Sequence, residues 1–215
     1  TFISQNLNSF QFNKSSKKFN FILNNIHKLN QNLFSYGTDN QTINENNIGI
    51  NIGISEDINS FSKILYGGKT NTSTFFQSKN YQYNYFEFQQ HLSFNKLKKT
   101  DINFSYIFKE KESPNLNTEM FSSHNLIFNF NKKSNSKNQL FGESKMVFIN
   151  YNGSENSILS YELLEGLANG INFVWELNVK HTLKNNMVLS IGYNGRKSEN
   201  SKTKHIGNMQ IQAYF

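Results

Sequence analysis

Residues 204–215 have the sequence KHIGNMQIQAYF, and this stretch decides the fold. As a β-strand it gathers its apolar side chains on one face, because strand side chains alternate with period two: Met209, Ile211, Ala213 and Phe215. The other face carries mainly amides, including Gln210 and Gln212. A strand with one apolar and one polar face predicts a sheet that separates an apolar environment from water.

The composition agrees with such a sheet. The chain has 21 Phe and 10 Tyr, although its mean hydropathy is only −0.62. This combination is typical of a barrel in which only alternate residues meet lipid, whereas a disordered polar chain would be poor in aromatic residues. The sequence has no run of roughly 18 apolar residues, as a membrane-spanning helix requires. It also lacks cysteine, which excludes disulfides and thiolate metal sites.

The same alternation recurs along the whole chain. It is clearest at residues 171–179 and recurs at 102–108, 126–130, 48–54 and 187–193. The connections between these segments are alternately short and long, with long ones at 37–47, 67–80, 110–122, 152–170 and 196–203. Short turns at one end and long loops at the other are typical of membrane barrels. The sequence therefore predicts an all-β, antiparallel up-and-down transmembrane β-barrel region of about 10–12 strands over residues 1–215.

Two details of this barrel follow from the count and the periodicity. A count of 11 strands is odd, so we expect a portion of a larger barrel with strands upstream of residue 1, unless one strand near 31–47 is wrongly merged or split. Tyr81, Tyr83 and Tyr85 share one parity, whereas Phe86 and Phe88 share the other. That change predicts a β-bulge or an extramembrane extension near Tyr85.

The final strand, with its C-terminal Phe, resembles the closing strand of bacterial outer-membrane β-barrel proteins. LLEGL (163–167), NFVW (172–175), YNGRK (193–197) and HIG (205–207) are similar to the C-terminal region of large Bacteroidota outer-membrane proteins. The resemblance implies an outer-membrane location with a periplasmic C-terminus, and recognition of the last strand by the barrel-assembly machinery. It also implies contact with outer-membrane lipid and with upstream strands or other subunits.

The periodicity assigns side chains to the two sides of the predicted barrel wall. We expect the lumen to be lined by Glu87, His91, Asn103, Lys109, Glu143, Lys145, Asn172, Glu176, Asn178, Lys180, Gln210 and Gln212. We expect lipid to contact Phe104, Tyr106, Phe128, Phe173, Trp175, Leu177, Leu189, Ile191, Ile211 and Phe215. The loop at 152–170 is unusually apolar for an exposed loop, which marks a partner surface or a lid that folds back: Leu159, Tyr161, Leu163, Leu164 and Leu167.

The function expected from these features is that of a channel, a translocation pore or a scaffold for surface partners, without enzymatic activity. His91 and Ser93 resemble the His-x-Ser pair of outer-membrane phospholipase A, which leaves a lipid-modifying hydrolase as one alternative. A soluble extracellular β-sandwich adhesin is the other. The scattered histidines predict no metal or other cofactor. The net charge of +7 comes largely from lysines in turns, so we expect no nucleic-acid partner.

Overall fold

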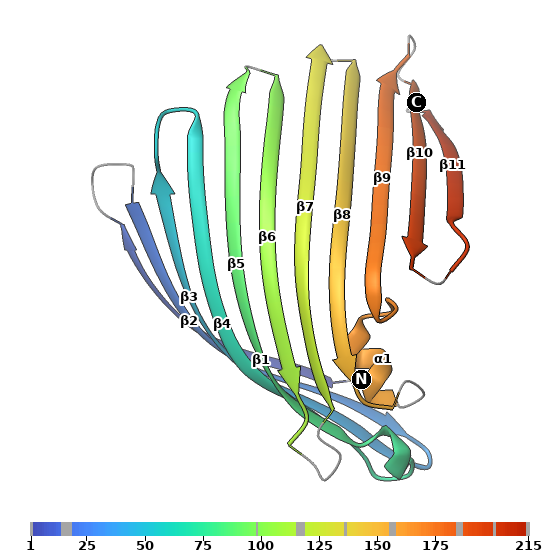
Figure 1. Ribbon diagram of the computed structural model, residues 1–215. Helices are drawn as coiled ribbons and strands as arrows, with labels where there is room; N and C mark the ends of the chain where they lie inside the picture. The colour runs from blue at the N-terminus through green and yellow to red at the C-terminus, as the bar shows by residue number, and fades with distance from the viewer. Residues whose placement is uncertain are drawn as a thin grey trace.

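The computed structural model describes residues 2–13, 19–97, 99–114, 119–135, 137–154, 158–183, 187–199 and 201–213. They form eleven strands, one short 3-10 helix and one α-helix (Figure 1). In chain order these are β1 (Phe2–Asn13), β2 (Phe19–Phe34), β3 (Gly37–Gly53), β4 (Ile58–Ser73), η1 (Gln77–Lys79), β5 (Tyr81–Leu97), β6 (Thr100–Glu112), β7 (Met120–Asn135), β8 (Asn138–Asn152), α1 (Ile158–Leu164), β9 (Gly170–Thr182), β10 (Met187–Ser198) and β11 (Lys204–Ala213).

The strands make a single antiparallel sheet in which each strand pairs with its neighbours in sequence, from β1 to β11. The predicted up-and-down topology and strand number are confirmed. The sheet is not closed, because the described residues of β1 and β11 do not pair with each other. Directions alternate along the sheet, so β1 and β11 run the same way.

The cross-strand register separates apolar from polar side chains. One row runs across nine strands and is apolar except at one position: Phe10, Leu23, Ile48, Ile64, Phe88, Phe108, His124, Phe148 and Ile171. We call the face that carries this row the apolar face and the opposite one the polar face. Residues directly opposite each other share a face, so the continuous register extends the pattern of a single strand to the whole sheet.

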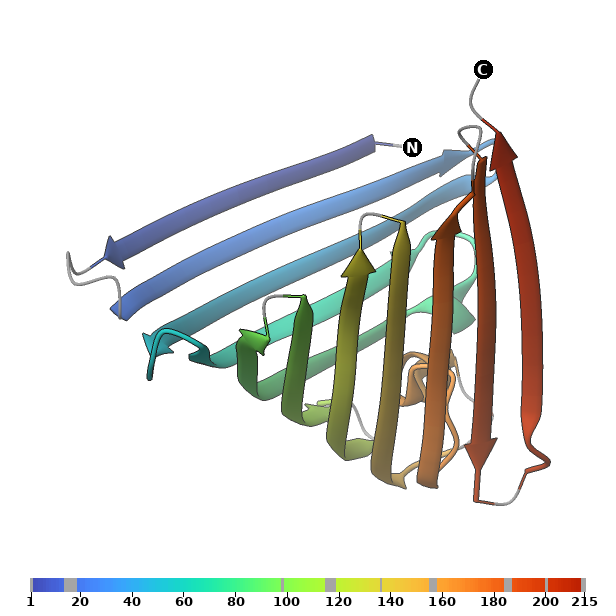
Figure 2. The ribbon, with the colours of Figure 1, turned by 90° about the horizontal axis from the view of Figure 1, so that it is seen from above.

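The sheet is curved, with the polar face on its concave side. Figure 2 shows the sheet bent into a trough. Glu162 of α1, in the connection after β8, forms an ion pair with Lys69 of β4, four strands away along the sheet. In a flat sheet those strands would lie roughly 19 Å apart, so the sheet must curl toward the polar face for this contact to form. Figure 1 also shows the twist that turns β1–β4 away from the direction of β7–β10.

Of the predicted long loops, 37–47 is wrong and 67–80 is shortened to 74–80. Residues 37–47 lie in β3, and β4 continues to Ser73. The apolar alternation stops there, but amide side chains pair across the strands instead: Asn25 Nδ2 donates to Asn46 at 2.7 Å, and Asn24 Nδ2 to Asn47 at 3.0 Å. These residues form a polar extension of the sheet beyond Leu23. The predicted bulge near Tyr85 is also absent, because the β4–β5 and β5–β6 registers are continuous there; the β5–β6 irregularity falls between Phe94 and Leu97.

Candidate functional site: the concave face and its docked helix

Helix α1 packs against the polar face at the end where β8 leads into β9 (Figure 1). Leu163 is the centre of this contact and has no exposed surface. Around it lies the main apolar cluster of the described residues: Tyr81, Tyr83, Phe121, Val147, Ile149 and Tyr151. Leu159, Leu164 and Leu167 are partly buried against the same cluster. The 152–170 loop therefore folds back, and burying these side chains stabilises the docked position.

Charged contacts tie the same connection to β4 and β6. Lys109 Nζ donates to both carboxylate oxygens of Glu165, at 2.8 and 3.0 Å, and Lys111 Nζ donates to one of them at 2.9 Å. Lys111 Nζ also donates to the carbonyl oxygen of Leu163 at 3.2 Å. A cation at the C-terminal end of a helix satisfies free carbonyl groups and complements the helix dipole. Lys111 is thus both an ion-pair partner and a helix cap.

Glu165 occupies a turn that brings its side chain back over the sheet. Its φ is 53° and that of Gly166 is 75°, so the chain reverses through two left-handed residues directly after α1. Burial by itself would raise the pKa of Glu165, but Lys111 and Lys109 outweigh that effect and lower its pKa to about 2. The carboxylate consequently stays ionised across the physiological pH range.

Asn172 anchors the other end of the connection. It accepts a hydrogen bond from Ala168 N at 3.2 Å and donates to Ala168 O at 2.7 Å. Ser198 Oγ on β10 also donates to it, at 2.6 Å. Asn172 is only 1% exposed, because the returning chain covers it. It lies on the polar face as the sequence indicates, but it does not line open space.

The register places every residue of the predicted lumen set on the polar face, and every described residue of the predicted lipid set on the apolar face. Phe215 lies outside the described residues. Sequence reasoning missed Lys69, Lys111 and Glu165 as a group. The spacing of Lys109 and Lys111 puts both lysines on one face of the strand. Two acidic residues of the apolar loop, Glu162 and Glu165, have the opposite charge, and this complementarity could have indicated the ion pairs.

His91 does not bond to Ser93. Its Nδ1 lies 2.6 Å from Ser105 Oγ, and its Nε2 lies 3.2 Å from Gln89 Oε1. The hydroxyl within hydrogen-bond reach of His91 therefore belongs to Ser105 on the neighbouring strand. Ser93 instead lines a polar hollow on the same face with Asn95, Asn103 and other neighbours. The pair that motivated the hydrolase alternative is therefore not assembled in this structure.

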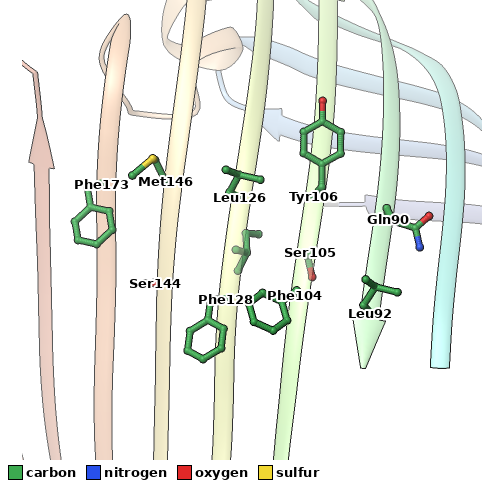
Figure 3. A pocket seen from close by; sticks show the side chains of 11 residues that line it. Gln90, Leu92, Phe104, Ser105, Tyr106, Leu126, Phe128, Ser144, Met146 and Phe173 are labelled. Atoms are coloured by element: carbon green, nitrogen blue, oxygen red, sulfur yellow. The ribbon is translucent and has the colours of Figure 1, made fainter. Parts of the chain in front are cut away.

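The apolar face carries a groove of about 430 Å³ across β5 to β9. Figure 3 shows Phe104, Tyr106, Leu126, Phe128, Met146 and Phe173 around it. Ser105, Tyr106 and Ser144 also line it. At its β5 end lies Gln90, whose amide nitrogen donates to Ser60 at 2.8 Å and whose oxygen accepts from Ser62 at 2.5 Å. The groove is thus apolar along most of its length.

Within the described ranges, no three His, Asp or Glu side chains are grouped to hold a metal ion. The same part of the chain contains no helix with the length and apolar character needed to cross a membrane. No protein-family model matches the chain, and no curated protein is significantly similar to it.

Proposed function

We propose that this chain forms part of the wall of a bacterial outer-membrane β-barrel that acts as a channel or translocation pore. Its apolar face contacts lipid, and its concave polar face lines a water-filled passage. The observation that carries the proposal is the division of side chains between the two faces in one register across the sheet. Lipid on one side and water on the other require this division, whereas a soluble sheet must bury its apolar face.

The dimensions of the apolar face support a membrane-spanning role. In β9 the apolar positions run from Ile171 to Val179, close to the roughly 9–11 residues with which a tilted strand crosses a bilayer. On neighbouring strands the apolar side chains give way to ring pairs with polar atoms. The Tyr106 hydroxyl lies 2.8 Å from His124 Nδ1, and the Tyr193 hydroxyl lies 2.7 Å from His205 Nδ1. Such amphipathic rings favour the boundary between lipid and water.

Helix α1 narrows the passage at its outer end. It lies on the concave side and is tied by ion pairs to β4 and β6, so it occupies space that the curved sheet would otherwise enclose. In this orientation the β8–β9 connection is extracellular and β11 runs toward the periplasm, where its C-terminal end is available to the assembly machinery. The edges of β1 and β11 pair with further strands, because unpaired backbone groups in lipid cost several kcal/mol each.

Lipid-soluble quenchers test the orientation directly, because Trp175 is the single tryptophan. Brominated acyl chains should quench Trp175 in the protein reconstituted with its completing strands. A matched variant that moves the indole to the next position, Trp175→Phe with Glu176→Trp, should be quenched by aqueous iodide instead. Equal quenching of both variants by the brominated lipid would refute the proposed sidedness. Absence of any ion conductance, with or without α1 docked, would refute the channel and leave the scaffold role.

A further inference from the structure

The groove on the apolar face owes its depth to a gap at Ser144. In one cross-strand row the side chains are Leu92, Phe104, Phe128, Ser144 and Trp175. Among these five, Ser144 is the only small residue, and it stands between two large aromatic ones. Figure 3 shows Ser144 on β8, with Phe128 on β7 to one side and Phe173 on β9 to the other.

Both aromatic neighbours of Ser144 lean away from it. Phe128 packs against Phe104 with ring centroids 5.0 Å apart. The indole of Trp175 lies over Gly195 on the other side, so closely that any Cβ at that position would collide with it. Neither ring therefore covers Ser144, and each is held back by a contact of its own. The gap is built by the packing on both sides.

We propose that this groove holds one acyl chain of a membrane lipid as a specific site, distinct from the general lipid layer. The proposal rests on the lipid-facing orientation given above. The lining of Phe104, Phe128, Leu126, Met146 and Phe173 matches a hydrocarbon chain and offers it no charge. The volume of about 430 Å³ falls in the usual range for small-molecule sites, about 300–1,000 Å³.

Toward β8 the polar side chain that lines the groove is the small Ser144, whereas the larger polar groups lie toward β5 and β6, and this difference sets the direction of the chain. Gln90 and Tyr106 lie there, and Gln90 is held in place by Ser60 and Ser62. An amide and a hydroxyl can bond to the ester oxygens of a lipid, so the ester end lies at Gln90 and the methyl end lies over Ser144. Barrel strands are tilted by about 35–45°, so a chain lying across them still descends into the bilayer.

The test uses phosphatidylcholine spin-labelled on its acyl chain, in vesicles containing the full protein with its completing strands. Ser144→Leu fills the gap with a lipid-compatible side chain, and Ser144→Ala keeps it open. We expect the motionally restricted part of the spectrum to lose at least one lipid per protein in Ser144→Leu and to stay unchanged in Ser144→Ala. Heat-modifiable migration on gels confirms that both variants are folded.

Three other outcomes would overturn the assignment in different ways. An unchanged restricted fraction in Ser144→Leu, with Trp175 still quenched by brominated lipid, would show that the groove holds only ordinary surrounding lipid. Displacement of the labelled phospholipid by free fatty acid at equimolar amounts would assign the site to a soluble ligand instead. No restricted lipid and no quenching in any variant would refute the lipid-facing orientation itself, and with it the proposed function.

Discussion

The carboxylate of Glu165 lies 2.9 Å from the ammonium group of Lys111, and this contact joins the α1 connection to β6 across the concave face. Lys111 also contacts aromatic rings: its Nζ is 5.0 Å from the centroid of Phe121 and 5.9 Å from that of Tyr83. The cation is therefore held by a carboxylate, a helix carbonyl and two ring faces, and each of these contacts favours the docked position of α1.

Replacing Lys111 should release α1. In Lys111→Met the alkyl stem remains, but the cap of α1 and one partner of Glu165 are lost. We expect docking to weaken by about 1–3 kcal/mol, the usual cost of removing one partner from a buried polar contact. Hydrogen exchange at residues 158–167 should rise, while exchange in β6 and β7 stays slow. Lys204→Met on exposed β11 is the control, and equal exchange in both variants would contradict the role of Lys111.

Docking of α1 should be sensitive to acid. The pKa of Glu165 is about 2 in the folded protein, below its ordinary value of 4.5. A lowered carboxylate pKa gives stability that is fully present above about pH 4.5 and is lost as the pH falls toward 2. The chain has no cysteine, so an environment-sensitive dye on Tyr161→Cys labels α1 alone. In Glu165→Gln the signal should no longer vary over this pH window; an identical acid response in that variant would assign the transition to another group.

Asn172→Ala should loosen the return from α1 to β9. The change removes the hydrogen bonds that the buried Asn172 side chain makes with Ala168 and Ser198. We expect a loss of about 1–3 kcal/mol in stability, measured as a lower urea midpoint. Asn178→Ala is the matched control on the same strand and face. A larger loss in the control would show that Asn172 is not an anchor.

Gly195 should tolerate no side chain, unlike Gly207 on the next strand. A Cβ at Gly195 would collide with the indole of Trp175, whereas nothing lies within 4 Å of one at Gly207. Gly195→Val should therefore displace Trp175, shift its emission and destabilise the sheet by about 1–3 kcal/mol, as overpacking does. Gly207→Val should leave the emission unchanged. Similar spectra for both variants would contradict the close contact of Trp175 with Gly195.

Most of the sheet could be predicted from the sequence because its strands have one apolar and one polar face. Residues 171–179 alternate with Val174 as the one exception, and that period alone gives the strand and the face of Trp175. The same criterion failed at 37–47, where Asn, Gln and Thr occupy both faces. There, amide pairs such as Asn25 with Asn46 hold the strands together, and a hydrophobic period cannot detect them.

The position of α1 could not be predicted because it depends on the curvature of the sheet. The leucines of the 152–170 loop indicate a buried face, but their contacts lie on strands distant in sequence. Leu163 shares a buried cluster with Tyr83 of β5 only because the sheet curls. The gap at Ser144 could not be predicted for a similar reason. A small residue leaves a groove in the sheet surface only when the neighbouring rings of Phe128 and Trp175 lean away from it.

The shared direction of β1 and β11 limits what can complete the proposed barrel. If a second copy of this sheet stood beside the first in the same membrane orientation, β11 of one would meet β1 of the other in parallel. Every such seam would break the antiparallel pairing on which membrane barrels are built. Identical copies of this sheet alone therefore cannot form an antiparallel ring of any size. Whatever completes the wall must insert an odd number of strands of different sequence between the two edges.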